Sequence, residues 1–102
     1  MIKREDIDKI INAARIEEVV GSFVELRKRG VNYIGLCPFH NEKTPSFNVN
    51  PAKGIFKCFG CGEGGDSVAF LMKHEHYTYP EALRWLANKY GIQIEEQILT
   101  QE

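Results

Sequence analysis

Residues 37–47 read CPFHNEKTPSF, and the sequence CFGC follows at residues 58–61. Each stretch carries two metal-ligand side chains three positions apart on a predicted tight turn, which we call a knuckle. The ligand pairs are Cys37 with His40 and Cys58 with Cys61. A knuckle directs both of its side chains at one ion. Between the knuckles the sequence predicts two strands and a turn, so a hairpin would bring the two pairs together.

Three thiolates and one imidazole form a donor set that selects zinc. Because protein side chains fill all four positions, none is left for water, and we expect one structural rather than catalytic zinc. Such a zinc contributes about 10–16 kcal/mol to folding in small peptides at neutral pH. The alternative is ordinary core thiols beside an incidental histidine, which the paired spacing argues against. His74 and His76 lie near a predicted helix end and form no knuckle, so they are not expected ligands.

The composition is that of one small globular domain. The chain has 102 residues, of which 43% are hydrophobic and 26% are charged. Its apolar runs are too short to span a bilayer, and no signal-peptide pattern begins at Met1. Three cysteines are an odd number, which argues against a closed disulfide framework. These features predict a cytosolic protein whose small fold is stabilised by a bound metal.

Hydrophobic periodicity predicts helices at both ends of the chain and strands in its middle. The expected helices cover residues 4–14, 16–21, 66–75 and about 79–90, and the expected strands lie within 23–30, 32–37, 46–50 and 54–59. Thr78-Tyr-Pro-Glu81 fits a capping box that starts the last helix. Residues 60–65, GCGEGG, are expected to lack regular structure.

The predicted fold class is therefore α+β, a small antiparallel sheet of the zinc-ribbon type with flanking helices. We expect a single domain over residues 1–102, with a frayed tail or the start of a linker after about residue 94. Each long helix has one apolar face that we expect to be buried. These faces comprise Ile7, Ile10, Ile11 and Ala14; Val68, Leu71 and Met72; and Leu83, Leu86, Ala87 and Tyr90.

The charge is unevenly distributed, although the net charge is only −1. Residues 21–60 carry six basic and two acidic residues, a net charge of +4, whereas residues 61–102 carry a net charge of −4. A basic segment within a neutral chain is a weak indication of a polyanionic partner.

Aromatic and basic residues interleave around the knuckles. Rings on a small sheet stack unpaired bases at roughly 1–3 kcal/mol per base, and Lys and Arg bind phosphates. The candidate nucleic-acid contacts are Arg27, Tyr33, Lys43, Thr44, Ser46, Phe47, Lys57 and Phe59. In the competing interpretation the rings are core residues, and we expect about half of them to be so. We expect Tyr33 to be exposed, because it is offset from Ile34 and Leu36, and Phe56 to be buried beside an exposed Lys57.

Two other acidic motifs have simpler interpretations. The stretch from Glu63 to Asp66 resembles a phosphate-cradling loop or an acidic metal site, but we expect it to be the exit from the second knuckle, with Asp66 as a helix cap. Asp6 and Asp8 resemble the carboxylate pair of two-metal enzymes. They lie in an amphipathic helix, where side chains two positions apart diverge, so we expect no catalytic pair.

The combination YIGLCPFHNEKTPSFNVNP (residues 33–51) with GIFKCFGCGEGGDSVAFLM (residues 54–72) is similar to the N-terminal zinc-binding domain of bacterial DNA primase. The similarity extends over nearly the whole chain, as far as Tyr90. It implies a zinc-ribbon-type domain with one structural zinc, and the family's three cysteines and one histidine correspond to Cys37, His40, Cys58 and Cys61.

In that family the domain helps to select initiation sites on single-stranded DNA template and assists primer start by the RNA polymerase domain. The resemblance therefore implies that the stretch from Lys43 to Phe47 faces the template. It also implies the polymerase domain as a partner, in cis or in trans, and the replicative helicase through parts of the full protein, all in the bacterial cytoplasm. The polymerase core's magnesium-binding acids are absent, so this domain is not expected to make primers alone.

Two alternatives from other classes remain. A structural zinc domain could dock on the polymerase domain without touching DNA. It would share the fold of a DNA-binding domain, but the polymerase domain rather than DNA would cover Tyr33, Lys43 and Lys57. A zinc hydrolase would need an open coordination position and a general base. The sequence offers four good protein ligands and no such base, so hydrolysis is the least favoured interpretation.

Overall fold

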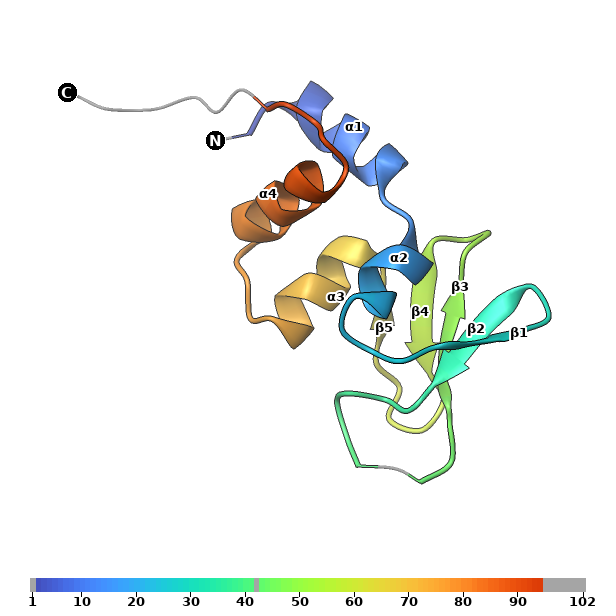
Figure 1. The fold of residues 1–102 in the computed structure, drawn as a ribbon. Coiled ribbons are helices and arrows are strands. Elements are labelled where there is room, and N and C mark those ends of the chain that lie inside the picture. The colour runs from blue at the N-terminus through green and yellow to red at the C-terminus, as the bar shows by residue number, and fades with distance from the viewer. Residues whose placement is uncertain (1, 42, 95–102) are drawn as a thin grey trace.

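The middle of the chain folds into a five-stranded antiparallel sheet, and helices from both ends cover one of its faces (Figure 1). This computed structural model describes residues 2–41 and 43–94. Its helices are α1 (Arg4–Ala13), α2 (Ile16–Gly21), α3 (Ser67–His74) and α4 (Tyr79–Lys89). Its strands are β1 (Arg27–Arg29), β2 (Asn32–Gly35), β3 (Phe47–Asn50), β4 (Ile55–Cys58) and β5 (Gly64–Gly65). The α+β class and the antiparallel sheet predicted from the sequence are confirmed.

The two central strands alternate between buried and accessible residues, as strands with one covered face must. In β3, Phe47 and Val49 are buried while the intervening asparagines are half-buried. In β4, Phe56 and Cys58 are buried while Ile55 and Lys57 are exposed. Because the strands are ordered β1-β2-β3-β4-β5 along the sheet, each strand pairs with its neighbours in sequence.

An aromatic cluster fills the space between the sheet and the helices. Helix α2 packs on β3, and α3 packs on β5 and α2. Phe70 of α3 contacts Phe56 edge-on, with ring centroids 5.6 Å apart, and Phe56 stacks on Phe47 at 5.4 Å. All three rings are buried, which makes them the centre of the core.

The short strand β5 was not expected, because residues 60–65 were predicted to have no regular structure. Gly64 and Gly65 pair with Lys57 and Phe56, which adds a fifth strand next to the second knuckle. The pairing needs glycine: Gly65 has φ +155°, and a Cβ there would lie 2.6 Å from the Cβ of Ala69. The glycines that argued against a strand therefore allow close approach of the backbone to β4 and α3.

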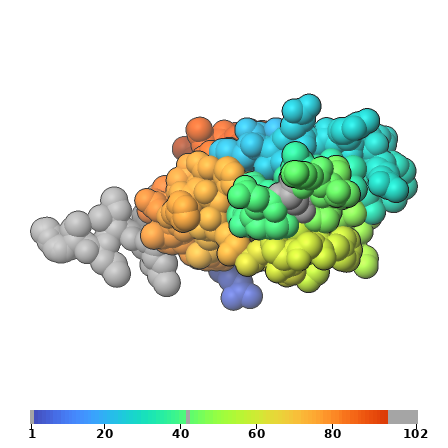
Figure 2. Space-filling model, turned by 90° about the horizontal axis from the view of Figure 1, so that it is seen from below, coloured from blue at the N-terminus to red at the C-terminus, as the bar shows by residue number. Residues whose placement is uncertain are grey.

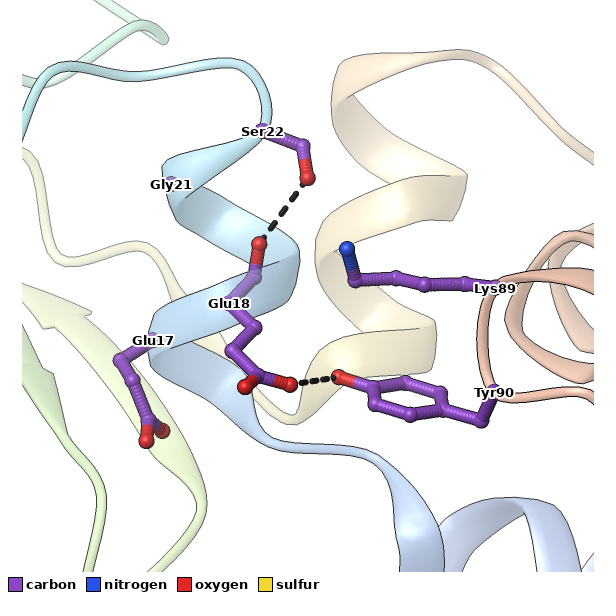
Figure 3. Close-up of a pocket in the computed structure, with 6 residues that line it drawn as sticks. All are labelled: Glu17, Glu18, Gly21, Ser22, Lys89 and Tyr90. Atoms are coloured by element: carbon purple, nitrogen blue, oxygen red, sulfur yellow. Dashed lines mark hydrogen bonds between the residues drawn. The ribbon is translucent and has the colours of Figure 1, made fainter.

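Helix α4 is held at both ends. At its start Thr78 and Glu81 form the predicted capping box, in which the Thr78 N–H donates to Glu81 at 2.8 Å and the Glu81 N–H donates to Thr78 at 3.3 Å. At its end the Tyr90 hydroxyl donates to the Glu18 carboxylate at 2.8 Å and accepts the backbone N–H of Arg15 at 3.0 Å (Figure 3). The bond to Glu18 joins the end of α4 to α2.

The predicted apolar faces are mostly correct, but two of their residues are exposed, Ile11 at 43% and Met72 at 39%. Ile7, Ala14 and Tyr90 are half-buried. Helix α1 lies against α4 rather than on the sheet, and its buried apolar face is narrower than the sequence pattern indicated. Among the described residues, no helix combines the length and the apolar character needed to cross a bilayer.

Candidate metal centre and open sheet face

The structure brings the four predicted ligands together. The sulfur atoms of Cys37, Cys58 and Cys61 and a ring nitrogen of His40 all lie within 4.8 Å of one another. The first knuckle follows β2 and the second follows β4, so the hairpin β3–β4 folds the chain back as expected. Viewed from below, the loop after the first knuckle lies between the strands β1 and β2 and the second knuckle (Figure 2).

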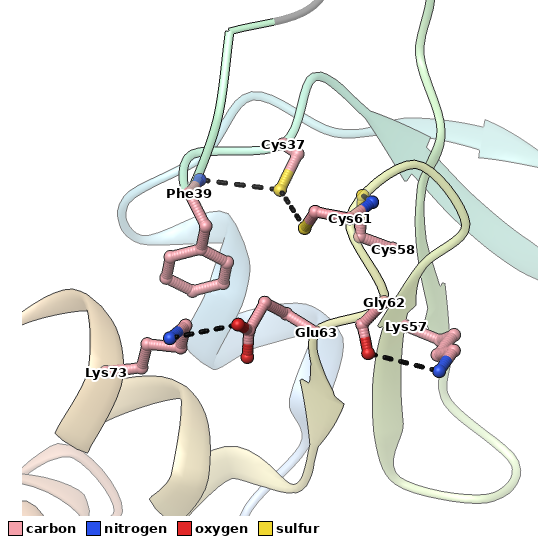
Figure 4. A network of polar contacts seen from close by, with 8 residues as sticks. All are labelled: Cys37, Phe39, Lys57, Cys58, Cys61, Gly62, Glu63 and Lys73. Atoms are coloured by element: carbon pink, nitrogen blue, oxygen red, sulfur yellow. Dashed lines mark hydrogen bonds and ion pairs between the residues drawn. The ribbon is translucent and has the colours of Figure 1, made fainter.

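Each knuckle folds around a cysteine sulfur that accepts backbone N–H groups (Figure 4). In the first, the N–H of Phe39 donates to Cys37 Sγ at 3.4 Å. In the second, Cys58 Sγ accepts the N–H groups of Gly60 and Cys61 at 3.3 and 3.4 Å. These donors stabilise sulfur in its thiolate form, which is the form that binds a metal.

The two buried thiols have opposite pKa shifts. Burial raises the pKa of Cys37 to about 12, with the Cys58 and Cys61 thiols adding to the shift and the Phe39 N–H opposing it. Burial also acts to raise the pKa of Cys58, but hydrogen bonds from Ser46, Cys61 and Gly60 outweigh it and lower that pKa to about 7. Three such close thiols hold several negative charges only when a cation neutralises them.

The donor set fits a closed structural site. Cys37 and Cys58 are buried, His40 is half-buried, and only Cys61 is exposed. The Sγ atoms of Cys37 and Cys61 lie 3.8 Å apart, which brings one ligand from each knuckle side by side. Soft sulfur donors with one imidazole suit zinc, and four protein donors leave no open position for catalysis.

Phe39 and Lys73 join the two knuckles, and neither was predicted to do so. The Phe39 ring packs against Phe47, Phe56, Phe70 and His74, with centroids 5.8–6.2 Å away. The ammonium of Lys73, on α3, lies 5.5 Å from the centre of that ring and 3.2 Å from the Glu63 carboxylate. Figure 4 shows Lys73 next to Phe39, which lies inside the first knuckle, and Glu63, which follows the second knuckle. No sequence signal separates Phe39 from the other phenylalanines.

The sheet face opposite the helices is polar and basic, and we call it the open face. Directly paired residues point to the same side of a sheet, so the register places Arg27, Ile34, Asn48 and Lys57 in one row across it. Arg27 and Lys57 are exposed. The strands β1–β4 contain no acidic residue, so no carboxylate of these strands offsets their positive charge.

The structure separates the eight candidate nucleic-acid contacts into two groups. Five are exposed: Arg27, Lys43, Thr44, Lys57 and Phe59. Phe59 is 71% exposed, and its N–H donates to the Ser46 carbonyl at 3.0 Å, which fixes the backbone that carries the ring. The ammonium of Lys57 donates to the Gly62 carbonyl at 3.2 Å and remains accessible.

The other three are placed differently from the prediction. Phe47 is fully buried, so the expectation that its ring faces a template is wrong, because β3 turns this residue toward α2 and α3. Tyr33 pairs with Val49 on the covered face and is half-buried, which corrects its predicted exposure. The Ser46 hydroxyl lies 3.5 Å from Cys58 Sγ, which places it with the metal ligands.

Sequence reasoning overlooked the asparagines of the open face. Asn32, Asn48 and Asn50 lie on it, and the exposed Lys53 follows in the turn between β3 and β4. The period-two alternation in FNVN and IFKC marks these positions as the accessible members of their strands. The alternation that predicts a buried Phe56 beside an exposed Lys57 therefore also predicts accessible asparagines in β3.

The remaining candidates have structural roles. Asp66 caps α3 by accepting the N–H of Ala69 at 2.9 Å, as predicted. Asp6 is buried and Asp8 is exposed, so the two carboxylates do not share an environment. The His74 ring stacks on Phe70 at 5.1 Å, and neither His74 nor His76 belongs to the described cluster of four ligands.

Comparison with known proteins agrees with the site. A family model described as a CHC2 zinc finger matches residues 2–102. The DNA primase of Listeria innocua is 46% identical over 95% of this chain, and that of Mycobacterium bovis is 55% identical over 88% of it. The crystal structure of the Aquifex aeolicus primase, which comprises zinc-binding and RNA polymerase domains, matches with a TM-score of 0.82 and 44% identity over 90% of this chain.

These matches cover only a small part of the larger proteins. The chain spans 16% and 14% of the two curated primases and 22% of the solved Aquifex chain. Within the matched region, the ligands of the zinc finger are the cluster of Cys37, His40, Cys58 and Cys61. The cluster is therefore the site of one zinc.

Proposed function

Because the chain belongs to the CHC2 zinc-finger family of bacterial DNA primase, we propose that it recognises single-stranded DNA template through the open face and helps a separate RNA polymerase domain to start primers. The observation that carries this proposal is the chemistry of the open face. It presents Arg27 and Lys57 in one row, the exposed ring of Phe59 on the Lys57 side, and no acid from strands β1–β4. Cations follow a phosphate backbone and an exposed ring stacks on an unpaired base.

The zinc supports this surface without taking part in chemistry. When bound, it supplies a rigid link between the knuckles, which hold Phe59 and the Lys57 contact to Gly62 in place. Primer synthesis would belong to other parts of the full protein, in the bacterial cytoplasm at the replication fork. The domain would therefore select template rather than catalyse.

Salt dependence of DNA binding tests the proposal. The zinc-loaded chain should bind a fluorescent single-stranded oligonucleotide with an affinity that falls as salt rises, with a slope of about −0.7 per phosphate contact. Lys57→Ala should weaken binding and make the slope shallower by about 0.7, because one phosphate contact is lost. Lys9→Ala, which removes an exposed cation from α1, is the matched control and should change neither quantity.

A second candidate function has its own observation. A hollow of about 510 Å³ beside the first knuckle is lined mainly by apolar residues, including Ile34, Leu36, Pro38 and Pro45. Leu36 is 50% exposed there, and such a surface suits docking on the polymerase domain. No binding of any oligonucleotide at low salt, together with binding of the separate polymerase domain, would favour docking over template recognition.

A further inference from the structure

Ser46 contacts the second knuckle twice, although the sequence predicted it to be a nucleic-acid contact. Its hydroxyl oxygen lies 3.5 Å from Cys58 Sγ, and its backbone carbonyl accepts the N–H of Phe59 at 3.0 Å. Ser46 directly precedes β3, and the next pair along the chain, Phe47 with Cys58, belongs to the β3–β4 register. The residue therefore continues the pairing of these strands as far as the metal centre.

Metal binding fixes the direction of the bond between the Ser46 hydroxyl and Cys58 Sγ. In the metal-free chain either atom can be the donor. A metal binds the thiolate, which carries no proton, so only the hydroxyl can then donate. Three thiolates and a neutral imidazole around Zn²⁺ leave the centre with one excess negative charge. A hydrogen bond to an ionised acceptor is stronger than one between neutral groups, so this donor stabilises the charged centre.

Cys58 receives its donors from two sources. Its sulfur is fully buried and accepts the backbone N–H groups of Gly60 and Cys61 at 3.3 and 3.4 Å. These two donors follow from the turn of the knuckle itself. The Ser46 hydroxyl comes from outside both knuckles, so a substitution can remove it and leave the turn unchanged.

We propose that Ser46 is a positioning residue of the metal centre, whose hydroxyl holds the Cys58 thiolate in place and sets how tightly the chain retains zinc. Removing a group that hydrogen-bonds to a metal ligand typically lowers metal affinity by about 10–100-fold. The inference goes beyond the proposed function, because zinc retention does not depend on template recognition.

Zinc competition measures the contribution of the hydroxyl. The zinc-loaded chain is titrated with a chromophoric chelator, whose absorbance gives the affinity for zinc and the rate of its release. Ser46→Ala removes the hydroxyl but keeps the carbonyl that accepts the Phe59 N–H, so the fold should be retained. We expect its zinc affinity to fall about tenfold and its zinc release to be faster. Ser46→Thr keeps a hydroxyl and should restore most of the affinity.

Ser22→Ala is the matched control. The Ser22 hydroxyl donates to the Glu18 carbonyl at 3.0 Å, so this variant also loses one hydrogen bond from a serine side chain. That bond involves no metal ligand. Ser22→Ala should therefore keep the zinc affinity and the rate of zinc release of the unaltered chain.

Cobalt gives a readout that a general loss of stability would not change. Co²⁺ in place of zinc has a sulfur-to-metal charge-transfer absorption, whose energy depends on the electron density of the thiolates. A hydrogen bond lowers the energy of the sulfur lone pairs, so its removal in Ser46→Ala should shift this absorption to longer wavelength. Ser46→Thr and Ser22→Ala should keep the spectrum of the unaltered chain.

Three results would overturn the inference. If Ser46→Ala keeps both the zinc affinity and the cobalt spectrum of the unaltered chain, the hydroxyl does not act on the thiolate. If Ser22→Ala loses as much zinc affinity as Ser46→Ala, the loss reflects stability rather than the metal centre. If Ser46→Ala retains zinc normally but binds oligonucleotides more weakly, Ser46 is a nucleic-acid contact instead. Both metal measurements are made without DNA, so a failure of the proposed template recognition would be a separate result.

Discussion

Cys61 differs from the other sulfur ligands because its side chain is exposed. The fold around Cys37 and Cys58 buries both thiols, so they contribute to the core as well as to the metal centre. Cys61 has no such second role. Its removal therefore isolates the contribution of metal binding from that of packing.

Cys61→Ser should reduce zinc content below one per chain and make the thermal transition broad and lower. The zinc site would be one sulfur ligand short, and the centre contributes to folding directly. Elemental analysis and melting followed by circular dichroism measure both effects. Val31→Ser, at a position 82% exposed, is the control and should leave both unchanged. A cooperative melt of Cys61→Ser that is independent of zinc would contradict the assignment of the centre.

Phe39 and Phe59 each lie one residue from a metal ligand, but their environments are opposite. Phe39 packs against four rings, so Phe39→Ala should lower the free energy of unfolding by about 2–3 kcal/mol, below the range for fully buried phenylalanines. Phe59→Ala should leave stability nearly unchanged and weaken oligonucleotide binding by about 1–3 kcal/mol. Urea denaturation measures the stability of both variants, and anisotropy titration measures their oligonucleotide affinity. A stable Phe39→Ala together with a destabilised Phe59→Ala would refute the placement of the two rings.

At the level of elements, the last helix depends on its first turn. Thr78 and Glu81 hold two N–H groups that the helix itself leaves unpaired. The hydrogen bonds from Thr78 lower the pKa of Glu81 below its ordinary value of 4.5. A lowered pKa means that the contribution is present above that ordinary value and is lost as the pH falls through the lower value of the folded state.

Thr78→Ala should therefore destabilise the chain by about 1 kcal/mol at neutral pH. The backbone N–H of residue 78 still donates to Glu81 in this variant, so only the smaller part of the acid loss of stability, from the hydroxyl, should disappear below about pH 4. Urea denaturation at pH 7 and at acidic pH measures both effects. Thr44→Ala, in an exposed loop, serves as the control, and an equal loss of stability from both variants would argue against the capping box.

The elements that the sequence predicted well are those with strong local signals. Capping residues and hydrophobic spacing located the helices to within two residues, and paired ligand spacing identified the metal centre. The face of Tyr33 depends on strand register, which the local sequence does not encode. The burial of Phe47, in contrast, follows from the alternation within FNVN. Strand β5 depends on the approach of two glycines to β4 and α3, a tertiary contact that overrides their low strand propensity. Alternation predicts the accessible residues of β3 and β4, whereas the alignment of Arg27 with Lys57 across the open face requires the register.

At the scale of the whole molecule, Tyr90 joins the two helical ends of the chain. Its hydroxyl connects residues 75 positions apart, from Arg15 in the linker before α2 to the end of α4. Burial raises the pKa of the Tyr90 phenol above its ordinary value, and the Glu18 carboxylate adds to the shift. Below about pH 10 the phenol is neutral in both states and its contribution is complete. Above that pH the unfolded chain loses the proton first, so stability falls as the pH rises.

Tyr90→Phe should lower the free energy of unfolding by about 1–2 kcal/mol at neutral pH, because two hydrogen bonds are lost. The variant should also lack the part of the alkaline loss of stability that begins near pH 10. Denaturant titrations at pH 7, 9 and 10.5 give both quantities. Tyr79→Phe, at a position 45% exposed, is the control. A Tyr90→Phe chain with unchanged stability and an unchanged alkaline profile would show that the contact to α2 contributes nothing.

The strand order, which follows the chain, has a consequence for biosynthesis. All four zinc ligands lie between residues 37 and 61, and the strands that position them pair only with sequence neighbours. All four ligands therefore emerge from the ribosome ahead of α3 and α4, which close the core. We expect a nascent hairpin that carries all four ligands to bind zinc before the helices fold onto the sheet. Metal supply during translation, rather than afterwards, would then determine how much of the newly made chain reaches the native state.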